Sequence, residues 1–356
     1  MRKFLTKTAA FAAAAAALVL AAGCSNDAAT PGAESASGLQ VAATTTQLQD
    51  FVHNIGGDKV QVTGLLKPGS SAHSFDPSPA DLKALAAADI LLVNGAGLDD
   101  FIHSAVEASG FKGEIVTVAD GVDLAEAAEI TAAARGGAIH NPAAASHDHS
   151  VDHDAEHDHG THHTHGANGT IDPHIWTSPR YANAMLQPIA QALAAADPEN
   201  TEFYRQNAAA YGAKLVALDE WLGNSFGQVD PAKKKFVSTH NALLYFLHDY
   251  QITYVGSVIP SFEDNAEPSA AELKTLVDNI KAAGVPAIFV ESSNSPRLNS
   301  TVAKEAGIPV VSDPIYADSL AAEGEASTYI GATISNARTM LTAWGYELSE
   351  PPAELQ

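Results

Sequence analysis

The chain has 356 residues, of which 46% are hydrophobic, and a formal net charge of −23 at pH 7. This length is sufficient for two domains of ordinary size, each with a hydrophobic core of its own. The negative charge argues against nucleic acid and anionic membrane surfaces as partners, because both repel an acidic protein. Cations remain compatible ligands.

The N-terminus predicts export. A basic start, "MRKFLTK", precedes the apolar run "TAAFAAAAAALVLAAGC", and we interpret residues 1–23 as a signal peptide. The run ends at Cys24, the only cysteine, in a context similar to a bacterial lipoprotein processing box, where the thiol is acylated after cleavage. Ala21 stands where the commonest box has Leu, so a plain secretory signal followed by a free thiol is the alternative.

Small and polar residues make up the segment after Cys24. We predict that residues 24–38 form a flexible tether, and that the protein is lipid-anchored to the outer face of the cell membrane, or periplasmic. No later stretch is apolar for long enough to span a bilayer, so the predicted membrane contact is the lipid anchor alone.

Strand and helix patterns alternate after Gly38. In the first half, strands are predicted at 39–45, 59–66, 89–95 and 114–118, and helices at 46–56, 78–88 and about 98–109. Ser78 is the expected N-cap of the second helix, with Pro79 at its first position. This alternation predicts a parallel sheet covered by helices on both faces.

The same alternation returns in the second half. Here strands are predicted at 234–240, 252–259, 286–292 and 309–313, and helices at 241–250, 267–284 and 295–307. Residues 76–95 and 267–292 share the pattern acid-Pro-Ser-x-Ala-acid-Leu-Lys-x-Leu before a buried strand, which suggests two lobes of similar construction. A chance likeness of two well-capped amphipathic helices is the alternative.

We therefore predict an α/β fold of two similar lobes with parallel sheets flanked by helices, joined by one long helix, with a metal cleft between the lobes. The predicted divisions are a signal peptide 1–23, a tether 24–38, an N-terminal lobe 39–196, a linking helix 197–226 and a C-terminal lobe 227–356.

A histidine-rich stretch, "HDHSVDHDAEHDHGTHHTHG", lies inside the N-terminal lobe at 147–166. Its polar surroundings cannot bury a core, so we predict a disordered loop over about residues 131–168. The histidines predicted to bind zinc weakly, as an auxiliary to a tight site, are His140, His147, His149, His153, His157, His159, His162, His163 and His165. A tolerated insertion with incidental metal binding is the alternative.

In parallel α/β sheets, ligands bind beyond the carboxyl ends of the strands. The metal-ligand side chains that follow predicted strands or lie in such loops, two in each lobe, are His73, His174, His240 and Asp318. Three neutral imidazoles and one carboxylate suit tetrahedral Zn²⁺, with Cu²⁺ and Ni²⁺ also possible on affinity. Taken singly, each histidine could be an ordinary loop residue, and Asp318 a helix cap.

Glu291, at a predicted strand end, could be a ligand, but we rank it as an acceptor for the second ring N–H of a ligating histidine. His53, His103 and His248 fall within predicted helices, where surface or satisfied packing positions are expected.

Four segments together resemble one family: "AHSFDPSPADL", "DPHIWTSP", "STHNALLYFLHDY" and "IYADSL". In this order they are similar to segments of the metal-binding solute receptors of bacterial ABC importers for zinc and manganese. The resemblance implies His73, His174 and His240 as ligands, Asp318 as the fourth, and Trp176 as a wall of the site. Manganese-binding members tend to have Glu at the position of His240, so His240 and the histidine-rich stretch point to zinc.

The predicted function is an extracytoplasmic receptor that captures Zn²⁺ as cargo and delivers it to an ABC transporter permease. It is expected to be a monomer without enzymatic activity, and a zinc metallochaperone is a further candidate partner. The alternatives are a manganese receptor of the same family and an exported zinc-dependent hydrolase, for which the chain lacks the H-E-x-x-H motif. A secondary role as a surface adhesin is left open.

Overall fold

The structure is a computed structural model, and it describes residues 38–73, 75–135, 171–262 and 266–355. Cys24 and the nine histidines between residues 140 and 165 lie outside the described residues, and so do the predictions made for them. Among the described helices, none is both long and apolar enough to cross a membrane.

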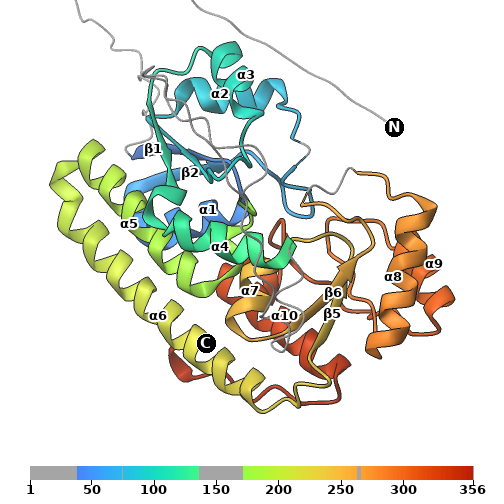
Figure 1. The fold of residues 1–356 in the computed structure, drawn as a ribbon. Coiled ribbons are helices and arrows are strands. Elements are labelled where there is room, and N and C mark those ends of the chain that lie inside the picture. The colour runs from blue at the N-terminus through green and yellow to red at the C-terminus, as the bar shows by residue number, and fades with distance from the viewer. Residues whose placement is uncertain (1–37, 74, 136–170, 263–265, 356) are drawn as a thin grey trace, which may run out of the picture. The chain divides into compact units, whose positions relative to one another are not determined.

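The first half of the described chain contains a four-stranded parallel sheet (Figure 1). Its strands are β1 (Leu39–Ala43), β2 (Val60–Gly64), β3 (Ile90–Val93) and β4 (Glu114–Thr117), in the order β2-β1-β3-β4. The central strand β3 reads Ile-Leu-Leu-Val and is buried throughout, as expected for a parallel strand covered on both faces. Its register places Val41 opposite Ile90 and Ala43 opposite Leu92.

Helices cover both faces of this sheet. Those of the first half are α1 (Thr46–Gly56), α2 (Pro79–Ala87), α3 (Ile102–Ser109), α4 (Leu124–Arg135) and α5 (Pro179–Ala196). Side chains of β1 alternate between the two faces: Val41 and Ala43 pack in the cluster that contains α1 and α5, whereas Ala42 packs in the cluster that contains α2 and α3. Helix α4 continues to Arg135, so residues 131–135, which were predicted to belong to the histidine-rich loop, are helical.

The second half contains two parallel strands, β5 (Lys235–Ser238) and β6 (Thr253–Ser257). Its helices are α7 (Leu244–Asp249), α8 (Ala270–Ala283), α9 (Arg297–Ala306) and α10 (Tyr329–Ala343). The two further strands predicted at 286–292 and 309–313 appear only as isolated bridges, Ile288 to Val310 and Glu291 to Ile315. Pro309 and Pro314 lie in the partner segment and lack the N–H groups that a continuous ladder requires.

Helix α6 (Thr201–Gly227) follows the first half and matches the predicted linking helix to within a few residues. One cluster of buried apolar side chains contains Phe51 of α1, Leu215 of α6, Phe236 of β5 and Met340 of α10. This cluster spans both halves, because helices α1, α6 and α10 pack together, and each half also has a smaller apolar cluster of its own. The lobe boundaries at 196 and 227 stay predictions.

The sequence echo between the two halves corresponds to a shared helix start. Ser78 caps α2 and Ser269 caps α8, each in a capping box, with Asp81 and Glu272 respectively. The short 3₁₀ helices lie at Gly57–Lys59, Val118–Gly121, Ile175–Thr177, Pro198–Asn200, Glu325–Ser327 and Ala353–Leu355.

Candidate metal site

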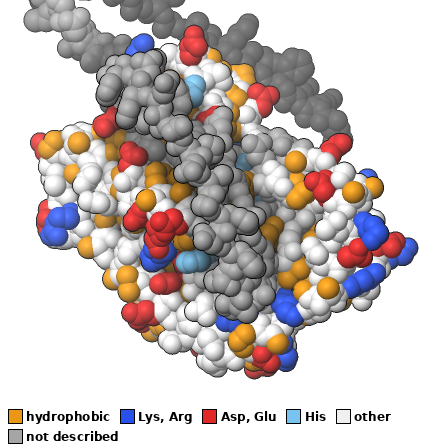
Figure 2. All heavy atoms as spheres, in the orientation of Figure 1, with side chains coloured by type: hydrophobic (Ala, Val, Ile, Leu, Met, Phe, Trp, Pro, Cys, Tyr) orange, Lys and Arg blue, Asp and Glu red, His pale blue; other side chains and the backbone are white. Residues whose placement is uncertain are grey.

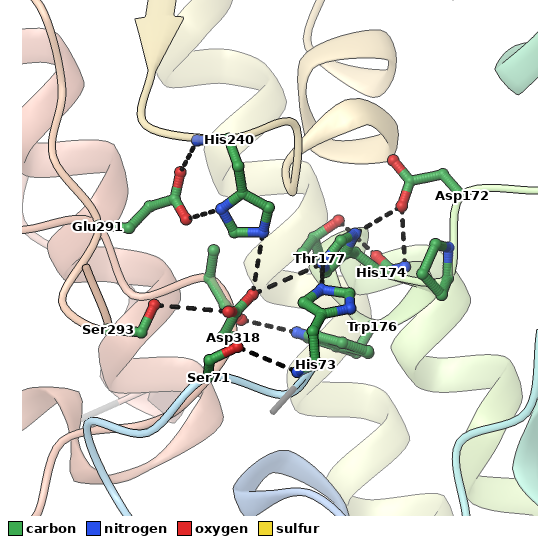
Figure 3. A network of polar contacts seen from close by, with 12 residues as sticks. Ser71, His73, Asp172, His174, Trp176, Thr177, His240, Glu291, Ser293 and Asp318 are labelled. Carbon is green, nitrogen blue, oxygen red and sulfur yellow. Dashed lines mark hydrogen bonds and ion pairs between the residues drawn. The ribbon is translucent and has the colours of Figure 1, made fainter. Parts of the chain in front are cut away.

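Four side chains from four separate parts of the chain converge on one point (Figure 3). They are His73, in the loop between β2 and α2; His174, just before the 3₁₀ helix at Ile175; His240, two residues after β5; and Asp318, after the bridge at Ile315. One potential ligand atom from each lies within 4.8 Å of every other. His174, His240 and Asp318 are buried, and His73 is half-buried.

Three distances between the ligand atoms can be compared with those around a tetrahedral zinc ion. The Nε2 atoms of His73 and His174 are 2.9 Å apart, and Asp318 Oδ1 lies 3.5 Å from His174 Nε2 and 3.4 Å from His240 Nε2. Zinc bonds of about 2.0–2.2 Å place the ligand atoms of a tetrahedron about 3.3–3.6 Å apart. The two distances from Asp318 Oδ1 match this spacing, whereas the distance between the Nε2 atoms of His73 and His174 is shorter.

His174 is oriented by Asp172. Asp172 Oδ1 accepts hydrogen bonds from the backbone N–H of His174 at 2.9 Å and from its ring Nδ1 at 2.6 Å. The backbone of Asp172 is itself fixed, because its N–H donates to Thr131 Oγ1 and its carbonyl accepts from Tyr245. Both side chains of the pair are fully buried, so the Nε2 atom of His174 is directed at the site.

His240 has an equivalent partner in Glu291. The ring Nδ1 of His240 is paired with Glu291 Oε2, and the backbone N–H of His240 donates to Oε1 at 3.0 Å. Thr239 in turn accepts from Glu291 N and from Asn299. Glu291 therefore lies on the far side of the imidazole from Asp318, in the place expected for an acceptor rather than for a ligand.

Asp318 Oδ1 and His240 Nε2 are buried and have no well-formed hydrogen bond within the described residues. Burying such groups without a partner is costly. Ser293 Oγ is 3.4 Å from the other carboxylate oxygen of Asp318 and leaves Oδ1 available. A cation held by these atoms would satisfy both.

The charges of the site are coupled. Burial lowers the pKa of His73 to about 3, and neighbouring His174 adds to this, so His73 is neutral. Burial also disfavours a charge on His174, but the carboxylate of Asp172 outweighs it and raises the pKa to about 9. Glu291 and Asp318 likewise outweigh burial and raise the pKa of His240, while these imidazoles hold the pKa of Asp318 well below its usual range.

The structure thus brings together all four residues selected from the sequence, with Glu291 beside His240 and Trp176 buried against His174, at a ring-centroid distance of 5.3 Å. His53, His103 and His248 are exposed on helices, as expected. Sequence reasoning missed Asp172. Its position two residues before His174 was a signal that could have identified it.

Comparisons with known proteins give relatives across most of the chain. The metal ABC transporter substrate-binding lipoprotein FimA of Streptococcus parasanguinis is 29% identical, over 81% of this chain and 82% of its own length. The manganese-binding lipoprotein MntA of Halalkalibacterium halodurans is 26% identical over 91% of this chain and 94% of its own length. The structure of the periplasmic zinc-binding protein TroA from Treponema pallidum superposes with a TM-score of 0.71 at 20% identity, covering 86% of this chain and 99% of that one, which shows a shared fold.

One family model matches residues 41–343, a span that contains the four converging side chains and most of both halves. Its description is zinc-uptake complex component A, periplasmic. A match over so much of the chain shows the family. The protein belongs to the ZnuA family of metal-binding receptors.

Proposed function

We propose that the protein captures Zn²⁺ through His73, His174, His240 and Asp318 and hands it to an ABC-type importer as cargo. The observation that carries this proposal is the donor set: three imidazole nitrogens and one carboxylate oxygen that all lie within 4.8 Å of one another. Such a nitrogen-rich set suits zinc, whereas manganese favours more oxygen ligands and a higher coordination number.

The runner-up is manganese transport, since MntA is named a manganese-binding lipoprotein. At 26% identity, that name leaves the metal of this chain open. An exported zinc-dependent hydrolase is less well supported. Four protein ligands would close the coordination sphere, and FimA is named a substrate-binding lipoprotein of a transporter.

The relatives also support the proposed cellular setting. Lipoprotein names for FimA and MntA favour an exported receptor anchored through Cys24, and substrate-binding components of this kind deliver to a permease. A metallochaperone that loads the receptor, and a monomeric state, remain proposals. Auxiliary zinc binding by the histidines of residues 140–165 is a proposal as well.

The first test is a zinc competition titration on the chain from residue 25 onward, with and without residues 140–166. We expect one tight zinc in both proteins and extra weak equivalents only with the histidine-rich stretch present. His240→Ala should remove the tight site, and an excess of Mn²⁺ should not displace the zinc.

The controls separate the alternatives. His53→Ala, on the exposed face of α1, should bind zinc like the parent chain. Loss of the tight site on deletion of residues 140–166, with His240→Ala unchanged, would contradict the four-residue site. Preferential manganese binding at that site would instead favour the runner-up.

A further inference from the structure

The segment that carries Asp318 is held in an unexpected way. Asp318 belongs by sequence to the second half of the chain, but residues 317–320 are hydrogen-bonded mainly to elements of the first half. Tyr316, one residue earlier, is still tied to Asn336 of α10 through two hydrogen bonds of 2.8 Å. The attachment therefore changes between residues 316 and 317.

The first turn of α1 makes a closed set of contacts with this segment. The backbone N–H of Leu320 donates to Thr46 Oγ1 at 2.8 Å. The Thr46 hydroxyl donates to Gln47 Oε1 at 3.1 Å, and Gln47 Nε2 donates to the carbonyl of Ala317 at 3.1 Å. Because each group has a defined donor or acceptor role, the three bonds are mutually consistent and fix the orientation of the Gln47 amide.

These contacts are buried and are not needed for capping. Thr46 and Gln47 are 4% and 2% exposed, and Ala317 and Leu320 are buried with them. The N-cap of α1 is Thr45, whose side chain accepts from Leu48 N. The side chains of Thr46 and Gln47 therefore bind Leu320 and Ala317, which lie on either side of Asp318.

Two further bonds tie the same segment to the other ligand-bearing loops. Trp176 Nε1 also donates to the carbonyl of Ala317, at 2.9 Å, and Gly69 N donates to Ser319 Oγ at 3.0 Å. Trp176 follows His174 by two residues, and Gly69 lies in the loop of His73. Asp318 is thereby connected to His73 and His174, whereas His240 is held separately by Glu291 and Ser238.

We propose that Gln47, acting with Thr46, is a positioning residue that fixes the Asp318 carboxylate for metal binding through the backbone of residues 317–320. Gln47 does not touch the ion. The inference rests on the proposed function and adds to it that three ligands form one hydrogen-bonded group, to which His240 is added from the second sheet.

The test is a double-mutant cycle on zinc affinity. Gln47→Met keeps the side-chain length but removes both hydrogen bonds. We expect it to weaken zinc binding by about tenfold, within the range of about 10–100-fold for residues that orient ligands, because Trp176 still holds Ala317. In an Asp318→Asn background the same change should alter the remaining zinc affinity by less than about twofold. In His240→Ala, which loses the tight site but keeps the other three ligands, the weaker zinc binding that remains should still fall by about tenfold.

A matched control is Gln49→Met on the same helix, whose side chain lies beside Gly64 and should leave zinc affinity unchanged. Thr46 provides a second test if Gln47→Met does not fold. Thr46→Val should weaken zinc binding, whereas Thr46→Ser, which keeps the hydroxyl, should bind zinc as tightly as the parent chain. Equal weakening by Gln47→Met in all three backgrounds would overturn the positioning role.

Failure of the inference can be distinguished from failure of the proposed function. If Asp318→Asn weakens zinc binding and Gln47→Met does not, only the role of Gln47 is wrong. If Asp318→Asn itself binds zinc as tightly as the parent chain, the four-residue site is wrong, and the positioning role with it.

Discussion

At the scale of single residues, the site depends on charges that are buried together. Asp172, Glu291 and Asp318 are each at most 2% exposed, and all three contact the histidine cluster. Without a counter-charge, burial of three carboxylates would be strongly unfavourable. Protonated His174 and His240 provide that charge in the metal-free protein, and a divalent cation can provide it instead.

Asp172 should therefore matter for affinity although it is not one of the four converging residues. We expect Asp172→Asn to weaken zinc binding by about 10–100-fold while the stoichiometry of one tight zinc is kept, since the amide can no longer stabilise the required ring orientation as a charged acceptor. A chelator competition titration measures this. Asp100→Asn, at an exposed position, is the control, and equal affinities of both variants would refute the role of Asp172.

At the scale of elements, local sequence signals determine where helices begin, whereas long-range contacts determine where the site forms. The capping boxes at Ser78 and Ser269 start α2 and α8 in a way that the sequence alone predicts. The site itself lies where loops from both sheets meet. Helix starts should thus affect stability and metal binding to different extents.

Ser269→Ala tests this separation. Removing the cap of α8 should lower the free energy of unfolding by about 1 kcal/mol, because the N–H of Glu272 loses its acceptor. Zinc affinity should stay unchanged, as α8 contributes none of the four converging residues. Urea unfolding and zinc titration of the same sample check both statements, and Ser104→Ala, an exposed helical position in α3, is the matched variant.

At the scale of the whole molecule, the acidic surface is compatible with a cation as the ligand. On the face drawn in Figure 2, acidic side chains lie over many parts of the surface, and basic ones gather with them over α8 and α9. An ion pair of 2.6 Å between Lys274 and Asp278 belongs to this region. The net charge of −23 is the sum over the whole chain. Such a charge attracts cations toward the protein surface, but it does not determine which residues coordinate them.

Zinc affinity should fall as the pH falls from 7.5 to 5. His174 has its pKa raised to about 9 in the metal-free protein, so it carries a proton throughout this range that zinc must displace. Lower pH raises the proton concentration and favours the metal-free form, by about tenfold in affinity per pH unit for each proton displaced. Titrations at four or five pH values measure the slope, and a flat response would contradict the assignment of His174.

Much of the local structure follows from the sequence. Buried apolar runs identify β1 and β3, alternation with helices gives the parallel topology, and Ser78 with Pro79 gives the start of α2. The four converging residues could be selected because each follows a strand or lies in a family-like segment. The irregular pairing of residues 288–315 could not be predicted from the sequence. Whether a proline interrupts a strand depends on which neighbouring strand would have accepted its missing N–H.

The sequence by itself determined most of the predicted strands and helices, the cap at Ser78 and the donor types, because these depend on neighbouring residues and on side-chain chemistry. Only the tertiary structure decided that Glu291 accepts from His240, that the two halves share a core, and that Gln47 contacts Ala317, 270 positions away. Contacts of that separation depend on how α1, α6 and α10 pack together. Periodicity within one segment carries no information about which distant backbone a buried amide will meet.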